Sequence, residues 1–138
     1  MTNTAKSQNI GLLALRLSVG LIFLMQGWGK LNAIEMPTAL LDGIGFPAAG
    51  FFAWLLAVTE FLGGIGLILG IWVRCFAKLL FVVMLVALFT VHIPGSFAGA
   101  MTPIALLGST LAVALLGGGA WQLMKDRECL PFCRMGKK

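Results

Sequence analysis

The sequence predicts an all-α integral membrane protein: a single transmembrane domain spanning residues 1–138, built as a four-helix bundle with both termini cytoplasmic. Apolar residues make up 59% of the chain and charged residues only 11%, well below the roughly one quarter that is usual in soluble domains. The apolar residues form four runs, each close in length to the roughly 20 residues that a helix needs to cross a bilayer. The basic residues gather near the ends of these runs on one side. These three observations together predict the fold class.

The first run covers residues 10–31 and is apolar except for Arg16, Gln26 and Lys30. A cleaved signal peptide is the alternative interpretation of such a run near the N-terminus. We expect the segment to remain in the mature protein, because its apolar part is too long and no small-residue cleavage site follows it. Residues 32–47 mix acids, prolines and glycines, which predicts an exposed or interfacial connection.

Three more apolar runs follow, and each is long enough to span. The second contains one charge, Glu60, and a tight turn at Arg74 joins it to the third. A link that opens with Pro94 precedes the fourth. These three predicted helices are residues 48–73, 75–93 and 103–124. The basic cytoplasmic tail is residues 125–138.

The positions of the positive charges predict the orientation, because Lys and Arg close to helix ends stay on the cytoplasmic side. Lys6, Arg74, Lys78 and the five basic residues of the tail lie on one side, and the opposite side has only Lys30. The ten basic residues surround apolar runs and form no single basic face, so we expect no nucleic-acid partner. The tail is expected to dock on anionic membrane lipids.

One face of the first helix combines charge with glycine. Arg16, Gly20, Phe23, Gly27 and Lys30 recur at spacings of four, three, four and three residues, which places them on one stripe. Glycine lets two helices approach closely in lipid, where no hydrophobic force drives their association. The stripe is therefore a predicted contact surface.

The second helix carries a similar stripe, formed by Glu60, Gly64, Leu67, Ile71 and Arg74. We expect the two stripes to face each other. An unpaired charge inside a bilayer costs about 2.5–3.5 kcal/mol on insertion scales, so Glu60 needs a partner. Counting about 1.5 Å per residue, an arginine on the first helix could bridge the offset in depth, which predicts a buried structural charge pair between Arg16 and Glu60.

Glu60, Lys30 and His92, with Gln26 between their levels, form the candidate functional site. An acid, a lysine and a histidine around an aromatic-lined cleft could bind a quinone or relay protons. The alternative is that these charges only fix helix register, with Lys30 and Arg74 extending to the membrane interface. No metal site is expected, because His92 is the only histidine.

The cysteines are the remaining candidates for chemistry. Cys129 and Cys133 could bind a metal or form a disulfide, but Pro131 lies between them and zinc would still lack two ligands. With Cys75 the count is odd, so a disulfide-stapled secreted domain is not indicated. We expect no catalytic role for these thiols.

These residues resemble the DoxX family of small bacterial membrane proteins. The resemblance rests on the stripe from Arg16 to Lys30 and Leu31, on Glu60 with the following Phe-Leu-Gly-Gly, and on a Leu-Ile-Leu-Gly-Ile-Trp-Val-Arg block ending at Arg74. His92 and the Gly-Gly-Gly-Ala-Trp of residues 117–121 add to it. The sequence departs from the family pattern at residues 103–105 and 122–124.

The resemblance implies a multi-pass protein of the bacterial inner membrane that is associated with redox systems. The leading hypothesis is a non-haem membrane subunit of a quinone-linked redox or oxidative-stress complex, with a redox protein as partner. The contrasting hypothesis is a structural or assembly membrane protein without catalytic activity of its own, including a homo-oligomer, in which the glycines pack helices and the charges hold register. A transporter is disfavoured, because four helices leave little room for a pathway.

Overall fold

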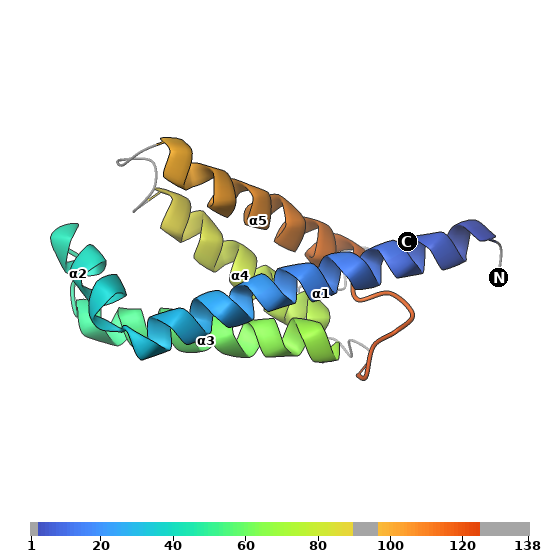
Figure 1. The fold of residues 1–138 in the computed structure, drawn as a ribbon, viewed down its shortest axis with the longest axis horizontal. Helices are drawn as coiled ribbons and strands as arrows, with labels where there is room; N and C mark the ends of the chain where they lie inside the picture. Colours follow the sequence, from blue (N-terminus) through green and yellow to red (C-terminus); the bar gives the residue numbers. More distant parts are fainter. Residues whose placement is uncertain (1–2, 90–96, 125–138) are drawn as a thin grey trace, which may run out of the picture.

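The structure, a computed structural model, describes residues 3–89 and 97–124. Within these ranges the chain is all-helical (Figure 1). The helices in chain order are α1 (Asn3–Asn32), α2 (Glu35–Gly43), α3 (Ala49–Leu69), α4 (Val73–Ala87) and α5 (Phe97–Leu116).

The helices pack as two antiparallel pairs. The most extensive contact joins α1 to α3, and the next joins α4 to α5, while α3 also packs against α4 and connects the two pairs. Figure 1 shows α2 at one end of the bundle, where α1 ends and α3 begins. We name this the α2 end. The opposite end, named the loop end, contains the turn between α3 and α4 and the segment that follows α5.

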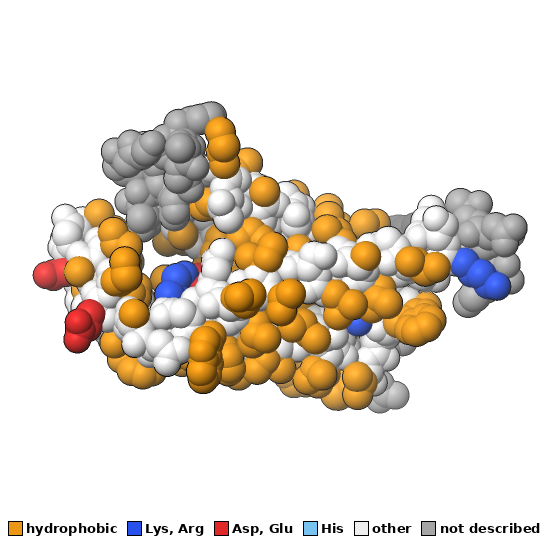
Figure 2. All heavy atoms as spheres, viewed as in Figure 1, with side chains coloured by type: hydrophobic (Ala, Val, Ile, Leu, Met, Phe, Trp, Pro, Cys, Tyr) orange, Lys and Arg blue, Asp and Glu red, His pale blue; other side chains and the backbone are white. Residues whose placement is uncertain are grey.

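The core lies where the four long helices meet. Phe23 of α1, Leu67 of α3, Leu80 of α4 and Val113 of α5 are fully buried. By contrast, large apolar side chains are exposed around the outside, and they are spread over the face seen in Figure 2. A surface of this kind suits lipid better than water.

Within the described part of the chain, two helices are long and apolar enough to cross a membrane: Lys6–Asn32 within α1, and Ala49–Leu69. Met101–Leu116, within α5, is a shorter apolar helix. The four tryptophans are each about half exposed or more. Trp28 and Trp54 lie toward the α2 end and Trp72 and Trp121 at the loop end, which is the distribution of an interfacial aromatic belt.

The predicted connection 32–47 contains a helix that the sequence pattern did not reveal. α2 can form there although it contains a proline, because Pro37 lies in its first turn. A backbone N–H at that position would have no partner within the helix, so its absence costs nothing. The predicted break around Pro47 is confirmed, because α3 begins two residues later.

The tight turn predicted between the second and third runs is confirmed, but it comes earlier than residue 74. Gly70 adopts a left-handed conformation (φ 73°) and donates to the carbonyl oxygen of Gly66, which ends α3. Trp72 is also left-handed, and α4 begins at Val73. Ile71 and Arg74 therefore do not continue the stripe of α3.

The predicted fourth helix, 103–124, is wrong at both ends. α5 begins earlier and runs through Pro103, and it ends at Leu116 because Gly117 and Gly119 have positive φ values of 81° and 73°. Residues 117–124 form a loop that crosses the loop end. Its last residue, Met124, donates its backbone N–H to the carbonyl oxygen of Gly70 at 3.3 Å.

Candidate functional site

A buried acid in the middle of α3 is the centre of the candidate site. Glu60 is completely buried, and the ammonium nitrogen Nζ of Lys30 lies 2.5 Å from both of its carboxylate oxygens. The Lys30 side chain is 29% exposed, so the pair is closed on the Glu60 side and accessible on the Lys30 side. A charge that would be costly in lipid is thus compensated by one cation.

The direction of the side chains explains why these two residues meet. A helical side chain leans toward the N-terminus of its own helix. Lys30 on α1 therefore leans back toward the middle of the bundle, and Glu60 on the antiparallel α3 leans toward the α2 end. The two groups approach each other along the seam between the helices.

Glycines bring the two helices close enough for this contact. A Cβ at Gly27 would lie 2.5 Å from the backbone nitrogen of Phe61, and one at Gly64 would lie 2.5 Å from that of Leu24. A Cβ at Gly20 would lie 3.0 Å from the carbonyl oxygen of Gly64. Any larger residue would push the backbones apart, so the expectation that the two stripes face each other is confirmed.

The predicted pair between Arg16 and Glu60 is wrong. Arg16 is buried, but its Nη1 donates to the carbonyl oxygens of Gly118 (3.0 Å) and Trp121 (2.8 Å) in the loop after α5. Its guanidinium packs against Gly70, ten residues or about 15 Å of helix beyond Glu60. Arg16 leans toward the loop end, and Glu60 leans away from it. The lean of the two side chains therefore increases the distance between their charged groups along the bundle instead of closing it.

The other predicted site residues are placed differently. Gln26 lies one turn before Lys30 and is half-buried, and among the described residues no hydrogen bond joins it to Lys30 or Glu60. Arg74 is exposed at the loop end, where its guanidinium packs against Gly117, in keeping with an interfacial position. His92 lies outside the described residues.

An apolar groove runs along the outside of the α1–α3 seam. Its volume is about 500 Å³. Trp28 and Phe61 form part of its wall, with ring centroids 5.9 Å apart, and they are close in sequence to Lys30 and Glu60. The lining residues are Leu24, Met25, Trp28, Gly29, Phe61 and Ile65.

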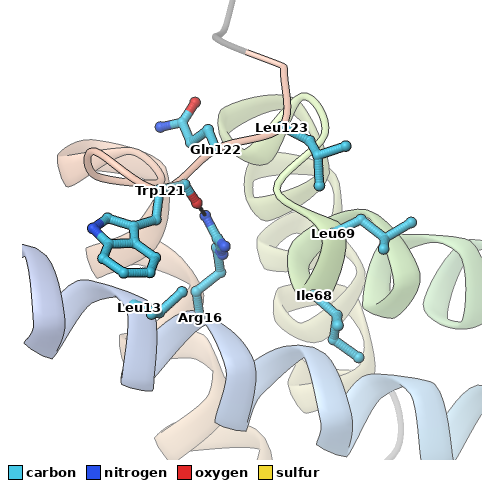
Figure 3. A pocket seen from close by; sticks show the side chains of 7 residues that line it. All are labelled: Leu13, Arg16, Ile68, Leu69, Trp121, Gln122 and Leu123. Carbon is cyan, nitrogen blue, oxygen red and sulfur yellow. Dashed lines mark hydrogen bonds between the residues drawn. The ribbon is translucent and has the colours of Figure 1, made fainter.

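A second pocket, of about 370 Å³, lies at the loop end (Figure 3). Leu13, Arg16 and Trp121 lie on one side of it, and Ile68, Leu69 and Leu123 lie on the other; Gln122 also lines it. Sequence reasoning missed this pocket, because it depends on a loop that hydropathy assigns to a helix.

The chemistry open to the site follows from its groups. An ammonium can donate hydrogen bonds, and a carboxylate can accept a proton, so Lys30 and Glu60 could together bind and protonate a polar ligand. Among residues 3–89 and 97–124, no group of three histidine, cysteine or acidic side chains could hold a metal ion. Cys75 is disulfide-bonded, while Cys129 and Cys133 lie outside the described residues.

Comparison with known proteins agrees with this arrangement. The DoxX family pattern matches residues 11–93, which include both members of the ion pair and the glycines between them. The chain belongs to the DoxX family. No solved structure is significantly similar to it.

Relatives match most of this DoxX chain, and two of them are named as membrane proteins. "Putative oxidoreductase CatD" of Bacillus subtilis (strain 168) is 31% identical, covering 96% of this chain and 94% of its own. "Inner membrane protein YqjF" of Escherichia coli (strain K12) is 27% identical, covering 86% and 92%. A Mycobacterium tuberculosis (strain ATCC 25618 / H37Rv) protein named only as a membrane protein is 31% identical, covering 80% and 77%.

Proposed function

We propose that this DoxX protein is a non-haem membrane subunit of a quinone-linked redox or oxidative-stress complex. The observation that carries the proposal is the ion pair between Lys30 and Glu60, which joins two helices that are each apolar enough to span the membrane. Ionisable groups within membrane spans are rare and commonly mark ligand or proton pathways. The name of the Bacillus relative CatD, which describes an oxidoreductase, supports the redox class.

The groove walled by Trp28 and Phe61, near neighbours in sequence of Lys30 and Glu60, has the properties of a quinone site. It is apolar, is walled by the rings of Trp28 and Phe61, and opens toward the lipid, where a quinone is dissolved. A quinone accepts two electrons and two protons when it is reduced. In this proposal the redox partner supplies the electrons, Lys30 donates a hydrogen bond to a quinone oxygen, and Glu60 exchanges protons.

The topology belongs to the same proposal. We infer that α1, α3, α4 and α5 cross the bacterial inner membrane with both termini cytoplasmic. The tryptophans at both ends of the bundle support this, as do Glu35 and Asp42 on α2, which are exposed at the end opposite the basic residues Arg74 and Lys78. The name of the E. coli relative also includes an inner-membrane location.

Purification from its own membranes in mild detergent tests the proposed function. Mass spectrometry and absorbance would show whether a quinone or a redox protein accompanies the chain. We expect at least one of them to co-purify with the wild-type protein and to be lost from Glu60→Gln. A colourless protein that carries only phospholipid would count against the redox assignment.

A structural or assembly protein, without catalytic activity of its own, is the second candidate. The observation that favours it is the close glycine contact between α1 and α3, across which Lys30 and Glu60 would hold the register of the two helices. This candidate predicts that Glu60→Gln lowers the melting temperature and disrupts the complex together. The redox proposal predicts lost turnover in a complex that remains assembled.

A further inference from the structure

A buried arginine at the loop end is only partly used by the protein. Arg16 is 3% exposed, and both of its hydrogen bonds are donated by Nη1, to Gly118 and Trp121. Its Nε is buried without a hydrogen-bond acceptor. Buried donors of this kind are costly when unpaired, so the Nε edge of the guanidinium is suited to an additional acceptor.

The charge of Arg16 is also uncompensated among the described residues. The acids in that part of the chain are Glu35 and Asp42 on α2 and Glu60, whose partner is Lys30. All three lie in the middle of the bundle or at its α2 end. None of these described acids supplies the acceptor that Arg16 lacks, and a bound anion would satisfy both the hydrogen bond and the charge.

The pocket beside Arg16 determines the shape of this anion. Figure 3 shows the guanidinium extending from α1 toward Trp121, with the space next to it bounded by Ile68, Leu69 and Leu123. A small polar anion would leave these apolar walls uncovered. A ligand with an anionic head and a hydrocarbon body would match both the cation and the walls.

The level of the pocket along the bundle favours a membrane lipid. The half-exposed Trp72 and the exposed Trp121 lie at this end, and tryptophan is enriched at the level of the lipid headgroups. Basic pockets between transmembrane helices on the cytoplasmic side are known to take anionic headgroups. We propose that the pocket at Arg16 binds the phosphate of an anionic phospholipid, with one acyl chain along Ile68 and Leu69. This site lies at the opposite end from the proposed quinone site and does not depend on it.

Native mass spectrometry of the full-length protein in detergent tests the proposal, with equal amounts of phosphatidylglycerol and phosphatidylcholine added as probes. Substituting Arg16 would also remove the bonds that hold the loop, so the informative variant is Leu69→Trp, which fills the pocket and leaves those bonds in place. Leu62→Trp is the matched control, because Leu62 is an exposed leucine two turns earlier on the same helix.

We expect wild type and Leu62→Trp to retain phosphatidylglycerol about tenfold more than phosphatidylcholine, because both lipids offer a phosphate but the choline cation cancels the net negative charge that would compensate Arg16. Leu69→Trp should lose this preference. Equal retention of the two lipids would overturn the proposal, and so would an unchanged preference in Leu69→Trp. Displacement of phosphatidylglycerol by millimolar inorganic phosphate, or by a quinone, would also overturn it, because the occupant would then be a free anion or a quinone.

Discussion

Among the described residues, three charged side chains are buried or half-buried, and the direction in which each leaves its helix determines its partners. Lys30 and Glu60 lean toward each other and form an ion pair with both distances at 2.5 Å. Arg16 leans the other way and binds two carbonyl oxygens of the loop after α5. Helical phase alone places all three on facing stripes, and the lean of the side chains determines which of them meet.

The ion pair gives the first prediction at this scale. Lys30→Met leaves Glu60 buried without its cation, so we expect a loss of about 3–5 kcal/mol in the free energy of unfolding. Adding Glu60→Gln should recover much of that loss, because the remaining charge is removed. Lys6→Met, which removes an exposed lysine from the same helix, should have little effect.

Unfolding in mixed micelles with increasing denaturing detergent, followed by helical circular dichroism, measures these differences. The contradicting result is a double variant whose loss in the free energy of unfolding equals the sum of the losses in Lys30→Met and Glu60→Gln. Such additivity would show that the two side chains are not coupled. The pairing described here would then be wrong.

The loop after α5 gives a second prediction. Arg16 holds it through the carbonyl oxygens of Gly118 and Trp121, and the side chain of Asn9 adds a bond from the N–H of Ala120 at 3.3 Å. We expect a protease to cleave residues 117–124 at least several-fold faster in Arg16→Gln than in wild type, because two charge-assisted bonds that hold the loop are lost. Asn9→Ala should show a smaller increase.

Limited proteolysis with mass mapping of the fragments provides the measurement. Equal cleavage of this segment in wild type and Arg16→Gln would show that Arg16 does not hold the loop.

At the scale of the helices, glycine determines which faces of α1 and α3 touch. Gly27 and Gly29 illustrate the difference, since they lie on the same helix two residues apart. A Cβ at Gly27 would meet the backbone of Phe61, whereas a Cβ at Gly29 would meet nothing within 4 Å.

Gly27→Ala should therefore destabilise the protein by about 1–3 kcal/mol through overpacking. Gly29→Ala should leave stability unchanged or raise it by up to about 1 kcal/mol, because alanine has the higher helix propensity. Thermal melting of the two variants in the same detergent compares them directly. A lower melting temperature for Gly29→Ala than for Gly27→Ala would contradict the packing described here.

The sequence alone predicts the elements that depend on periodicity and misses those that depend on backbone conformation. The stripes of α1 and α3 follow from a period of 3.6 residues, and their contact is confirmed. The loop at 117–124 opens with three consecutive glycines, a turn signal that the hydropathy of the run outweighs, and the left-handed conformations of Gly117 and Gly119 show that the helix ends there. α2 was missed because acids, proline and glycine usually indicate a connection.

Only part of the candidate site could be predicted, because periodicity predicts which helix faces meet but not the relative depth of the helices. Periodicity brought Lys30 and Glu60 to facing helices, but it assigned Glu60 the wrong partner, since the relative depth of two packed helices is not encoded in either helix alone. The pocket at Arg16 could not be predicted, because it requires the loop to fold back over α1. The placement of His92 stays a prediction.

At the scale of the whole molecule, charge and aromatic side chains differ between the two ends. The described acids lie on α2 and in the middle of α3, while Arg16, Arg74 and Lys78 lie toward the loop end. This asymmetry predicts that the loop end faces the cytoplasm.

Reporter fusions at the C-terminus test that orientation. We expect a green fluorescent protein fusion to be fluorescent and an alkaline phosphatase fusion to be inactive, because the second enzyme becomes active only after export. An alkaline phosphatase fusion inserted after Gly43, at the opposite end, should be active and serves as the control. The reverse pattern would place both termini outside the cytoplasm and contradict the proposed topology.

Quinone binding to the purified protein in lipid nanodiscs tests the central claim most directly, with decylubiquinone as the probe. Wild type is compared with Glu60→Gln and with Glu35→Gln, which makes the same change at an exposed acid on α2. We expect wild type and Glu35→Gln to bind equally, and Glu60→Gln to bind about tenfold more weakly, as the loss of one charged interaction would cause. Equal binding by all three, or no binding by wild type, would contradict a quinone site at Lys30 and Glu60.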